Sequence, residues 1–280
     1  MWYNLFMTKV FYNKRKYKKR LKLRKKNFCY FIVLIIASIL FIYSLINIII
    51  WLIDSPKTKE VVDDLEKVKV VEVNNDDAEI IPSDEPKSGL YWDFIKMSLI
   101  DVDINELKKK NNDTVAWIQV GGTNVNYPIV QTTDNDFYLD HSFTKEKNTA
   151  GWLFMDYRNN LSIMDQNTIV YGHNRKDQTM FGTLKNVTTR KWFDVSDNQI
   201  IKMSSENNNT LWQIFSVYII PTTNDYLNLT IDQALLDTIA GRSIYKFNAH
   251  VTTDDKIITL STCNGADKKL VVHAKLIKIN

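Results

Sequence analysis

An almost unbroken apolar stretch at residues 28–53 restricts this chain more than any other part of its sequence. Only Ser38, Ser44 and Asn47 interrupt it. A helix of roughly 20 apolar residues is enough to cross a bilayer, so this stretch is long enough to span one. The apolar region of a cleaved signal peptide is shorter, typically about 7 to 15 residues, and ends at small residues, whereas this one ends in IIIWLI. We therefore expect a permanent transmembrane helix.

The two flanks of this stretch differ in charge. Residues 1–27 carry 11 Lys and Arg side chains and no Asp or Glu, whereas Asp54 follows the stretch directly. Basic residues concentrate on the cytoplasmic side of membrane spans, so we expect a basic cytoplasmic head and an extracellular body. The predicted localisation is the cell membrane, with a single span. The head is also suited to binding anionic lipid at the inner leaflet, in agreement with this orientation.

The rest of the chain is acidic. All 32 Asp and Glu side chains, but only 25 of the 36 Lys and Arg side chains, lie after residue 27. This balance argues against nucleic acid as a partner. Residues 54–89 contain no aromatic residue and are rich in Lys, Asp, Glu, Val and Pro. We expect them to form an extracytoplasmic stalk, in which residues 61–73 form at most a transient helix or strand.

One folded domain is expected over residues 90–280. Apolar residues recur at intervals of three and four over residues 90–107, which predicts one or two N-terminal helices, and a further helix is expected at residues 230–241. Short β-rich runs separated by turn-forming clusters follow, and they predict strands at residues 115–120, 126–130, 168–171, 211–220, 256–260 and 270–279. Many short strands with few helices favour a mainly β fold, with an antiparallel or mixed barrel, over a doubly wound sheet.

Cys263 is the first candidate for chemistry. The only other cysteine, Cys29, lies in the apolar stretch, so the membrane separates the two and rules out a disulfide between them. A lone extracellular cysteine is a small buried residue, a partner in an intermolecular disulfide or a reactive thiol. Cys263 ends a β-prone run and precedes Asn264-Gly265, a position that exposes a nucleophile. We find no glycine-rich phosphate loop and no paired-cysteine metal motif.

A cysteine nucleophile needs a base or a cation nearby, and histidine is the usual choice. His173 directly follows a predicted strand, where the chain turns and the side chain can enter a cleft. His141 and His250 lie in polar loops. His273 shares a face of the last predicted strand with Lys269, and would be a second titrating group only if that face lined the cleft. The residues alone favour His173 without excluding the other three.

Several motifs of this chain resemble those of class B sortases. The sequence TLSTC at residues 259–263 resembles the sortase cysteine motif, and YGHN at residues 171–174 resembles the histidine motif. Five further segments match the class in order: DTVAWI (113–118), YPIVQ (127–131), DNDFYL (134–139), FMDYRN (154–159) and TMFG (179–182). Several motifs in order are harder to meet by chance than one. The resemblance covers residues 90–280 and implies a sortase-type β-barrel with an N-terminal helix.

The resemblance implies three catalytic residues. They are Cys263 as nucleophile, His173 as its acid/base partner, and a cation on the following strand that is an arginine in the family. This chain has no arginine after Arg242, and alignment of the last strand puts Lys269 in that place. Lysine keeps the charge but lacks the planar two-pronged donor. Loss of one oxyanion donor commonly costs a factor of roughly 10² to 10³ in rate, which bounds the expected penalty.

The resemblance also implies four substrate-binding residues: Asn135, Leu139, Tyr171 and Ser261. Taken as residues alone, Leu139 and Tyr171 fit equally well in a core, and Ser261 fits a structural hydrogen bond to the backbone. Residues 221–226 are a further candidate for a wall of the groove.

The implied reaction is that of a cysteine transpeptidase. Cys263 would cleave a sorting motif of the Asn-Pro-X-Thr type after Thr, and the thioacyl intermediate would then pass to a peptidoglycan amine. His173 would protonate the first leaving amine and deprotonate the second. The implied partners are secreted proteins with a sorting motif, the amine acceptor and the membrane. No metal and no cofactor is implied.

Three other interpretations remain open. A cysteine peptidase shares the thioacyl intermediate and differs only in that water attacks it. A non-catalytic anchored binding module is suggested by the missing arginine, although Cys263 and His173 are both retained within their motifs. A pilin-polymerising sortase would call for an extended lid segment and a second hydrophobic anchor, and neither is visible in the sequence.

Overall fold

The computed structural model describes residues 2–74, 78–82, 89–265 and 267–280, with side chains from residue 27 onward. Two compact units divide the chain, Met1–Ile53 and Asp54–Asn280. In chain order, the helices and strands are α1 (Trp2–Leu65), β1 (Val70–Val73), β2 (Glu79–Ile80), α2 (Leu90–Ile95), β3 (Leu99–Val102), α3 (Ile104–Lys110), β4 (Thr114–Val120), β5 (Asn126–Val130), η1 (Phe137–Leu139), β6 (Phe154–Met155), β7 (Asn167–Tyr171), η2 (Leu184–Thr188), α4 (Arg190–Phe193), η3 (Ser196–Asn198), β8 (Ile200–Ser205), β9 (Asn209–Pro221), α5 (Gln233–Gly241), β10 (Ile257–Cys263) and β11 (Lys268–Ile279).

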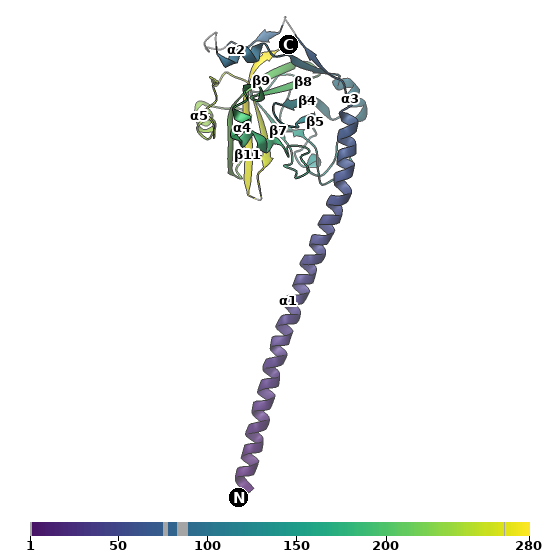
Figure 1. Cartoon of the computed structure of the whole chain (residues 1–280), viewed down its shortest axis with the longest axis vertical. Coiled ribbons are helices and arrows are strands. Elements are labelled where there is room, and N and C mark those ends of the chain that lie inside the picture. Colours follow the sequence, from purple (N-terminus) through teal and green to yellow (C-terminus); the bar gives the residue numbers. More distant parts are fainter. Residues whose placement is uncertain (1, 75–77, 83–88, 266) are drawn as a thin grey trace. The chain divides into compact units, whose positions relative to one another are not determined.

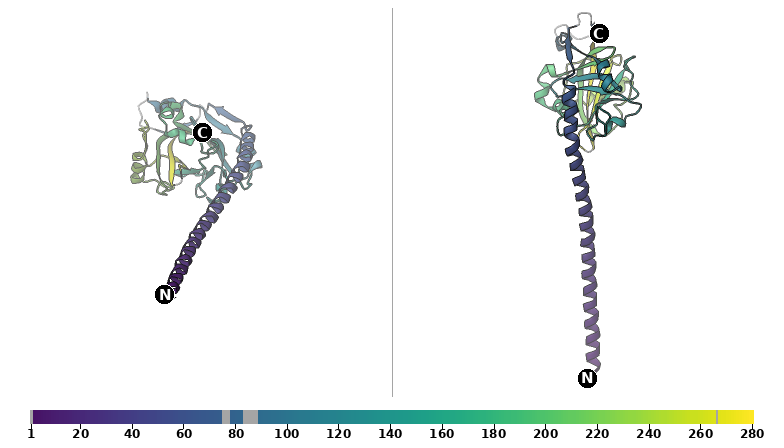
Figure 2. Two further views of the ribbon diagram at one scale, coloured as in Figure 1. Left: turned by 60° about the horizontal axis from the view of Figure 1, so that its bottom comes forward. Right: turned by 90° about the vertical axis from the view of Figure 1, so that its right-hand side faces the viewer.

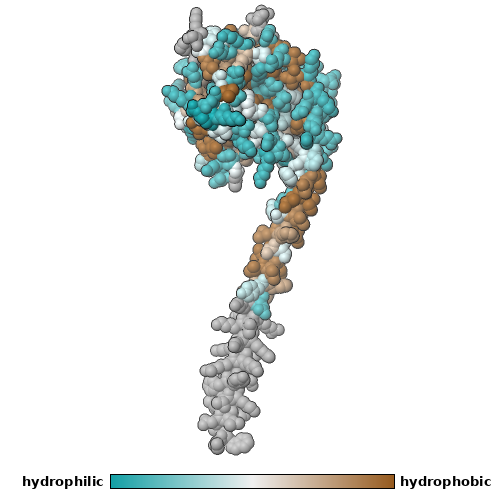
Figure 3. All heavy atoms as spheres, viewed as in Figure 1, coloured by the Kyte–Doolittle hydropathy of each residue, from teal (hydrophilic) through white to brown (hydrophobic). Residues whose placement is uncertain are grey.

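The first unit is helical and belongs to α1. The part of α1 from Asn27 onward contains an 18-residue window with a mean hydropathy of 2.8, none of which is buried. Its exposed apolar side chains cover this part of the helix (Figure 3). Within the described residues this is one helix that is long and apolar enough to cross a membrane. By length and composition it fits the span expected at residues 28–53.

Eight strands of the second unit close into a barrel. They neighbour one another in the order β10, β7, β6, β5, β4, β8, β9 and β11, and the pairing of β10 with β11 closes the ring. The short strand β2 adds to the far end of β11. Figures 1 and 2 show the strands curving around a common core, with the short helices on the outside. The mainly β fold with a sortase-type barrel and added helices is thus confirmed.

Large side chains fill the barrel. Trp117, Trp152 and Trp212 are among the largest side chains that are fully buried. The strands β9 and β11 are buried along almost their whole length, because the barrel packs on one face and the loops and helices cover the other. Near-continuous apolar runs are expected of strands that are covered on both faces.

The six predicted strands are present, most of them with shifted ends, and two strands of the barrel, β6 and β8, were not predicted. β6 has only two residues, too few for a periodic signal, and β8 has the sequence IIKMSS, in which Lys202 and two serines dilute the apolar pattern. The expected N-terminal helices are α2 and α3, which β3 separates. The helix expected at residues 230–241 is α5, which begins at Gln233 after its N-cap residue Asp232.

Residues 54–73 differ from the expected stalk. The end of α1 buries Asp54, Thr58, Val62 and Leu65, β1 pairs with β3, and the later β2 pairs with β11. The overall composition of this segment conceals the few residues that recur at helical spacing and lie on one face. Residues 75–77 and 83–88 of the expected stalk lie outside the described residues.

Candidate active site

The parallel pair β7 and β10 brings two of the predicted catalytic residues to one edge of the barrel. Tyr171 lies opposite Ser261 in the register, Gly172 N donates to Ser261 O at 3.4 Å, and Thr262 Oγ1 donates to Gly172 O at 2.7 Å. Parallel strands end on the same side of a sheet. His173 and Cys263 each lie two residues beyond this pair, so both leave the barrel at the same edge.

The hairpin from β10 to β11 adds the third predicted residue. Cys263 lies opposite Lys269, and Lys269 Nζ is 3.3 Å from Cys263 Sγ. Asn264 N donates to Lys268 O at 2.8 Å, and Gly265 has a φ of +88°, a left-handed conformation that glycine adopts without strain. Directly opposed side chains of an antiparallel pair lie on one face. The short hairpin therefore places the ammonium beside the exposed thiol.

The imidazole of His173 is held by the segment before β6. Its Nε2 lies 2.6 Å from Leu139 O, and because a carbonyl only accepts, Nε2 carries the proton. Gly151 has a φ of +59°, and a Cβ atom there would lie 2.9 Å from His173 Cδ2 and 2.8 Å from Leu139 O. Only glycine leaves room for the ring at this point.

A buried carboxylate ties two of the predicted substrate residues together. Asp156 is fully buried and accepts from Tyr171 Oη at 2.8 Å, from Asn135 Nδ2 at 3.1 Å and from Arg158 Nε at 2.8 Å. Burial alone would raise the pKa of Asp156, but the hydrogen bonds, first those from Arg158, outweigh it and lower the pKa. Burial, followed by the hydrogen bond to Asp156, raises the pKa of Tyr171. Asp156 stays ionised and fixes both side chains.

Ser261 lies beneath the cysteine rather than on the surface. Its side chain is 3% exposed, and its Oγ lies 2.9 Å from Tyr226 Oη. Tyr226 is itself buried, and burial raises its pKa. The structure thus gives Ser261 a hydrogen bond inside the protein, whereas Leu139 is 43% exposed near His173.

Two contacts of the candidate site were not expected from the sequence. Asp156 lies within the motif FMDYRN, but no residue pattern revealed that it is buried under Asn135 and Tyr171. Tyr226 lies in the segment 221–226, which was expected only as a whole to be near the groove. A tyrosine or an aspartate that lies between turn residues carries no signal of its burial.

The other three histidines make different contacts. His141 Nδ1 lies 2.7 Å from Phe137 O, and the two rings stack at 4.0 Å. The carbonyl of His250 accepts from Lys275 Nζ. His273 is fully buried, so it does not line the cleft, and burial lowers its pKa to about 3. No group of three or more metal-binding side chains occurs in the described part of the chain.

A closed barrel with a thiol, an imidazole and an ammonium at one edge defines a cysteine-dependent β-barrel enzyme. The sequence model of the sortase domain matches residues 118–277. Sortase B of Staphylococcus aureus (strain NCTC 8325 / PS 47) is 36% identical over 183 residues, which cover 62% of this chain and 74% of that protein. The chain therefore belongs to the sortase family of cysteine transpeptidases.

Solved structures support the same assignment. A Staphylococcus aureus sortase B–substrate complex aligns with a TM-score of 0.59 and 35% identity, over 62% of this chain and 84% of that one. Sortase B from Bacillus anthracis in complex with AAEK1 aligns with a TM-score of 0.63 and 30% identity, over 81% of this chain and 99% of that one. The family resemblance stated from the motifs is thus confirmed.

Proposed function

We propose that this sortase is a membrane-anchored transpeptidase that cleaves a sorting motif of the Asn-Pro-X-Thr type after Thr and joins the secreted protein to a peptidoglycan amine. The observation that carries the proposal is the distance of 3.3 Å between Cys263 Sγ and Lys269 Nζ. Cys263 ends β10, which runs parallel to β7, the strand that leads to His173. The similar Staphylococcus aureus structure is a complex with a substrate, which supports a peptide substrate here.

In the first step the Cys263 thiolate attacks the threonine carbonyl carbon and forms a C–S bond. The C–N bond to the next residue breaks, and His173 gives its proton to the leaving amine. In the second step the acceptor amine attacks the thioester and passes a proton to His173, and the thiolate leaves. Since Leu139 O holds Nε2–H, Nδ1 is the ring nitrogen that exchanges these protons.

Lys269 takes the place of the family's arginine in this proposal. Lys269 and Cys263 lie at the end of the same hairpin. The ammonium can therefore donate to the thiolate and to the oxyanion that forms when the thiolate attacks the carbonyl. A single ammonium gives point charge rather than a two-pronged donor. We therefore assign Lys269 a weaker version of the arginine's role.

The proposed topology places residues 1–27 in the cytoplasm, residues 28–53 across the membrane and the barrel outside the cell. The 11 basic residues on the N-terminal flank support this orientation. The catalytic unit then begins at Asp54, because residues 54–65 pack onto it.

The test uses the full chain in detergent micelles with fluorogenic peptides that bear Asn-Pro-X-Thr or Leu-Pro-X-Thr-Gly motifs, with and without an amine acceptor. We expect cleavage after Thr, a thioacyl adduct detectable by mass spectrometry and a ligated product when the amine is present. Cys263→Ala should abolish all three. Cys29→Ala is the matched control and should leave them unchanged, because Cys29 lies in the apolar helix.

The other results separate the alternatives. Hydrolysis of the peptide with no ligated product, even when the amine acceptor is present, would identify a cysteine peptidase. Neither cleavage nor adduct in the native chain and in Lys269→Arg would contradict the proposal and point to a binding module.

A further inference from the structure

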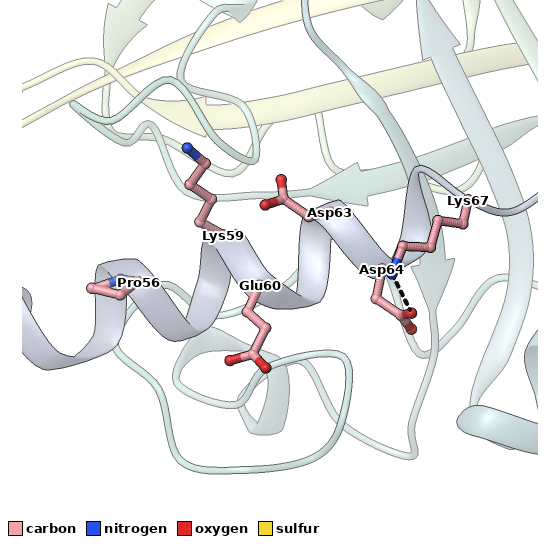
Figure 4. Close-up of a pocket in the computed structure, with 6 residues that line it drawn as sticks. All are labelled: Pro56, Lys59, Glu60, Asp63, Asp64 and Lys67. Carbon is pink, nitrogen blue, oxygen red and sulfur yellow. Dashed lines mark ion pairs between the residues drawn. The ribbon is translucent and has the colours of Figure 1, made fainter.

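The helical segment 54–65, which directly follows the apolar stretch, packs onto the catalytic unit along one face. Asp54, Thr58, Val62 and Leu65 are buried there, at the spacing of one helical face. The opposite face is solvated, and Figure 4 shows the residues that line an open hollow there: Pro56, Lys59, Glu60, Asp63 and Asp64 of the helix and Lys67 just after its end. Asp54 is only 8% exposed, and a buried carboxylate is costly unless it is bonded.

The partners of Asp54 lie in the turn at residues 148–151. Asp54 Oδ2 accepts from Thr149 N at 2.8 Å and from Thr149 Oγ1 at 2.6 Å. Thr58 Oγ1 lies 3.3 Å from Asn148 Oδ1, and Gly151 N donates to Asn148 O at 3.0 Å. The helix therefore holds the turn at residues 148–151, which ends at Gly151, the glycine next to the His173 ring.

A second contact reaches the loop that follows His173. Arg175 Nη2 donates to Ser55 Oγ at 3.0 Å, and Ser55 Oγ lies 3.4 Å from Asp177 Oδ2. Arg175 is 8% exposed and its Nε lies 3.0 Å from Asp177 Oδ2, which makes this loop rigid. Phe181 N donates to His173 O at 3.0 Å and closes the loop.

His173 thus lies between two segments that one helix end holds. The turn 148–151 ends at Gly151, whose Cβ position lies 2.9 Å from His173 Cδ2, and the loop 174–181 begins directly after His173. We propose that Asp54 and Ser55 are positioning residues for His173, so that the first residues beyond the apolar stretch set the geometry of catalysis. This inference rests on the proposed acid/base role of His173.

The expected effect follows from the contacts that are lost. In Asp54→Ala the amide and hydroxyl of Thr149 lose their common acceptor, and the turn against the imidazole is released. A misplacement of about 1 Å at a reacting group costs up to about 100-fold in rate, so we expect kcat to fall about 10- to 100-fold. KM should stay within about twofold, because β7 and β10 are not touched and uniform binding is kept.

The experiment compares the full-length native chain with Asp54→Ala, Asp54→Asn and Ser55→Ala in detergent micelles. Asp54→Asn keeps one amide oxygen as an acceptor for Thr149 and should lose less kcat than Asp54→Ala. The matched control is Glu60→Ala, an exposed carboxylate on the same helix that makes none of these contacts (Figure 4). Its kcat should equal that of the native chain.

Amide hydrogen exchange gives a readout that does not depend on activity. Residues 148–151 should exchange faster in Asp54→Ala and residues 174–181 faster in Ser55→Ala, while β10 stays protected in both. Should Asp54→Ala fail to fold, Asp54→Asn and Ser55→Ala carry the same comparison. Unchanged kcat and unchanged exchange in the folded variants would overturn the inference. A native chain that is inactive, but in which the variants still loosen both segments, would refute the proposed function alone.

Discussion

The hydrogen bonds of the buried His273 lead us to expect that the folded chain loses stability in acid. Its Nδ1 lies 2.8 Å from Thr259 Oγ1, which donates to Asn167 Oδ1 at 2.7 Å and therefore accepts the proton of Nδ1. Its Nε2, 2.8 Å from Tyr218 Oη, then accepts from the phenol. With a neutral ring, every group in this buried series of hydrogen bonds has a partner. A second ring proton would point at the hydroxyl proton of Tyr218 and would place a charge in the core.

The magnitude follows from the pKa of His273. Burial, and then the charge of Arg242, lowers that pKa from 6.5 to about 3. Between these values the unfolded chain binds a proton that the folded chain excludes, so stability is complete above the unfolded pKa and falls as the pH drops toward 3. At about pH 4.5 protonation of the imidazole favours the unfolded chain about 100-fold, which corresponds to about 3 kcal/mol of lost stability.

The assay compares urea unfolding of the full-length native chain and of His273→Gln, followed by tryptophan fluorescence in micelles. Glutamine can accept from Tyr218 and donate to Thr259, but it does not titrate. Between about pH 7.5 and about pH 4.5 the native chain should lose about 3 kcal/mol more stability than the variant. Acidic side chains contribute to both proteins and cancel in the difference. A difference between the two proteins that does not change with pH would refute the reasoning.

Three further predictions concern the active site and its support. Lys269→Ala should lower kcat/KM by a factor of roughly 10² to 10³, and Lys269→Arg should equal or exceed the native value in the peptide assay, because the guanidinium is a planar two-pronged donor. Equal rates for the native chain and both variants would remove Lys269 from the mechanism. Gly151→Ala should lower kcat by about 100-fold in steady-state kinetics, because its Cβ would lie within 2.9 Å of His173 Cδ2; an unchanged kcat would show that the ring has room to move. Leu65→Ala should destabilise the chain by about 2 to 5 kcal/mol in urea unfolding, because Leu65 is 2% exposed; a neutral effect would support the expected stalk.

The barrel was largely predictable because its strands are apolar runs bounded by turn residues. The periodic signal failed where a strand was very short, as in β6, or diluted by polar residues, as in β8. It failed again at residues 54–65, where four buried residues in one helical stripe are outnumbered by charged ones. Composition averages over a segment, whereas packing depends on which face each residue occupies.

The residues of the candidate site could be predicted from the sequence, but the contacts between them could not. Motifs pointed to Cys263, His173 and Lys269, yet Lys269 lies beside Cys263 because of the register of a hairpin. The same holds for Asp156, whose partners come from three different segments. Such contacts depend on how distant strands align, and a single sequence does not state that alignment.

The order of strands around the barrel also determines when the protein acquires its chemistry. β7 delivers His173, but its parallel neighbour β10 and the closing strand β11 are the last two strands of the chain. A chain that is made from its N-terminus therefore carries this imidazole without the thiol until Cys263 is added. The thiol and its ammonium neighbour arrive together, at the moment the ring of strands closes. A copy that ends before β10 therefore lacks both the thiol of Cys263 and the ammonium of Lys269.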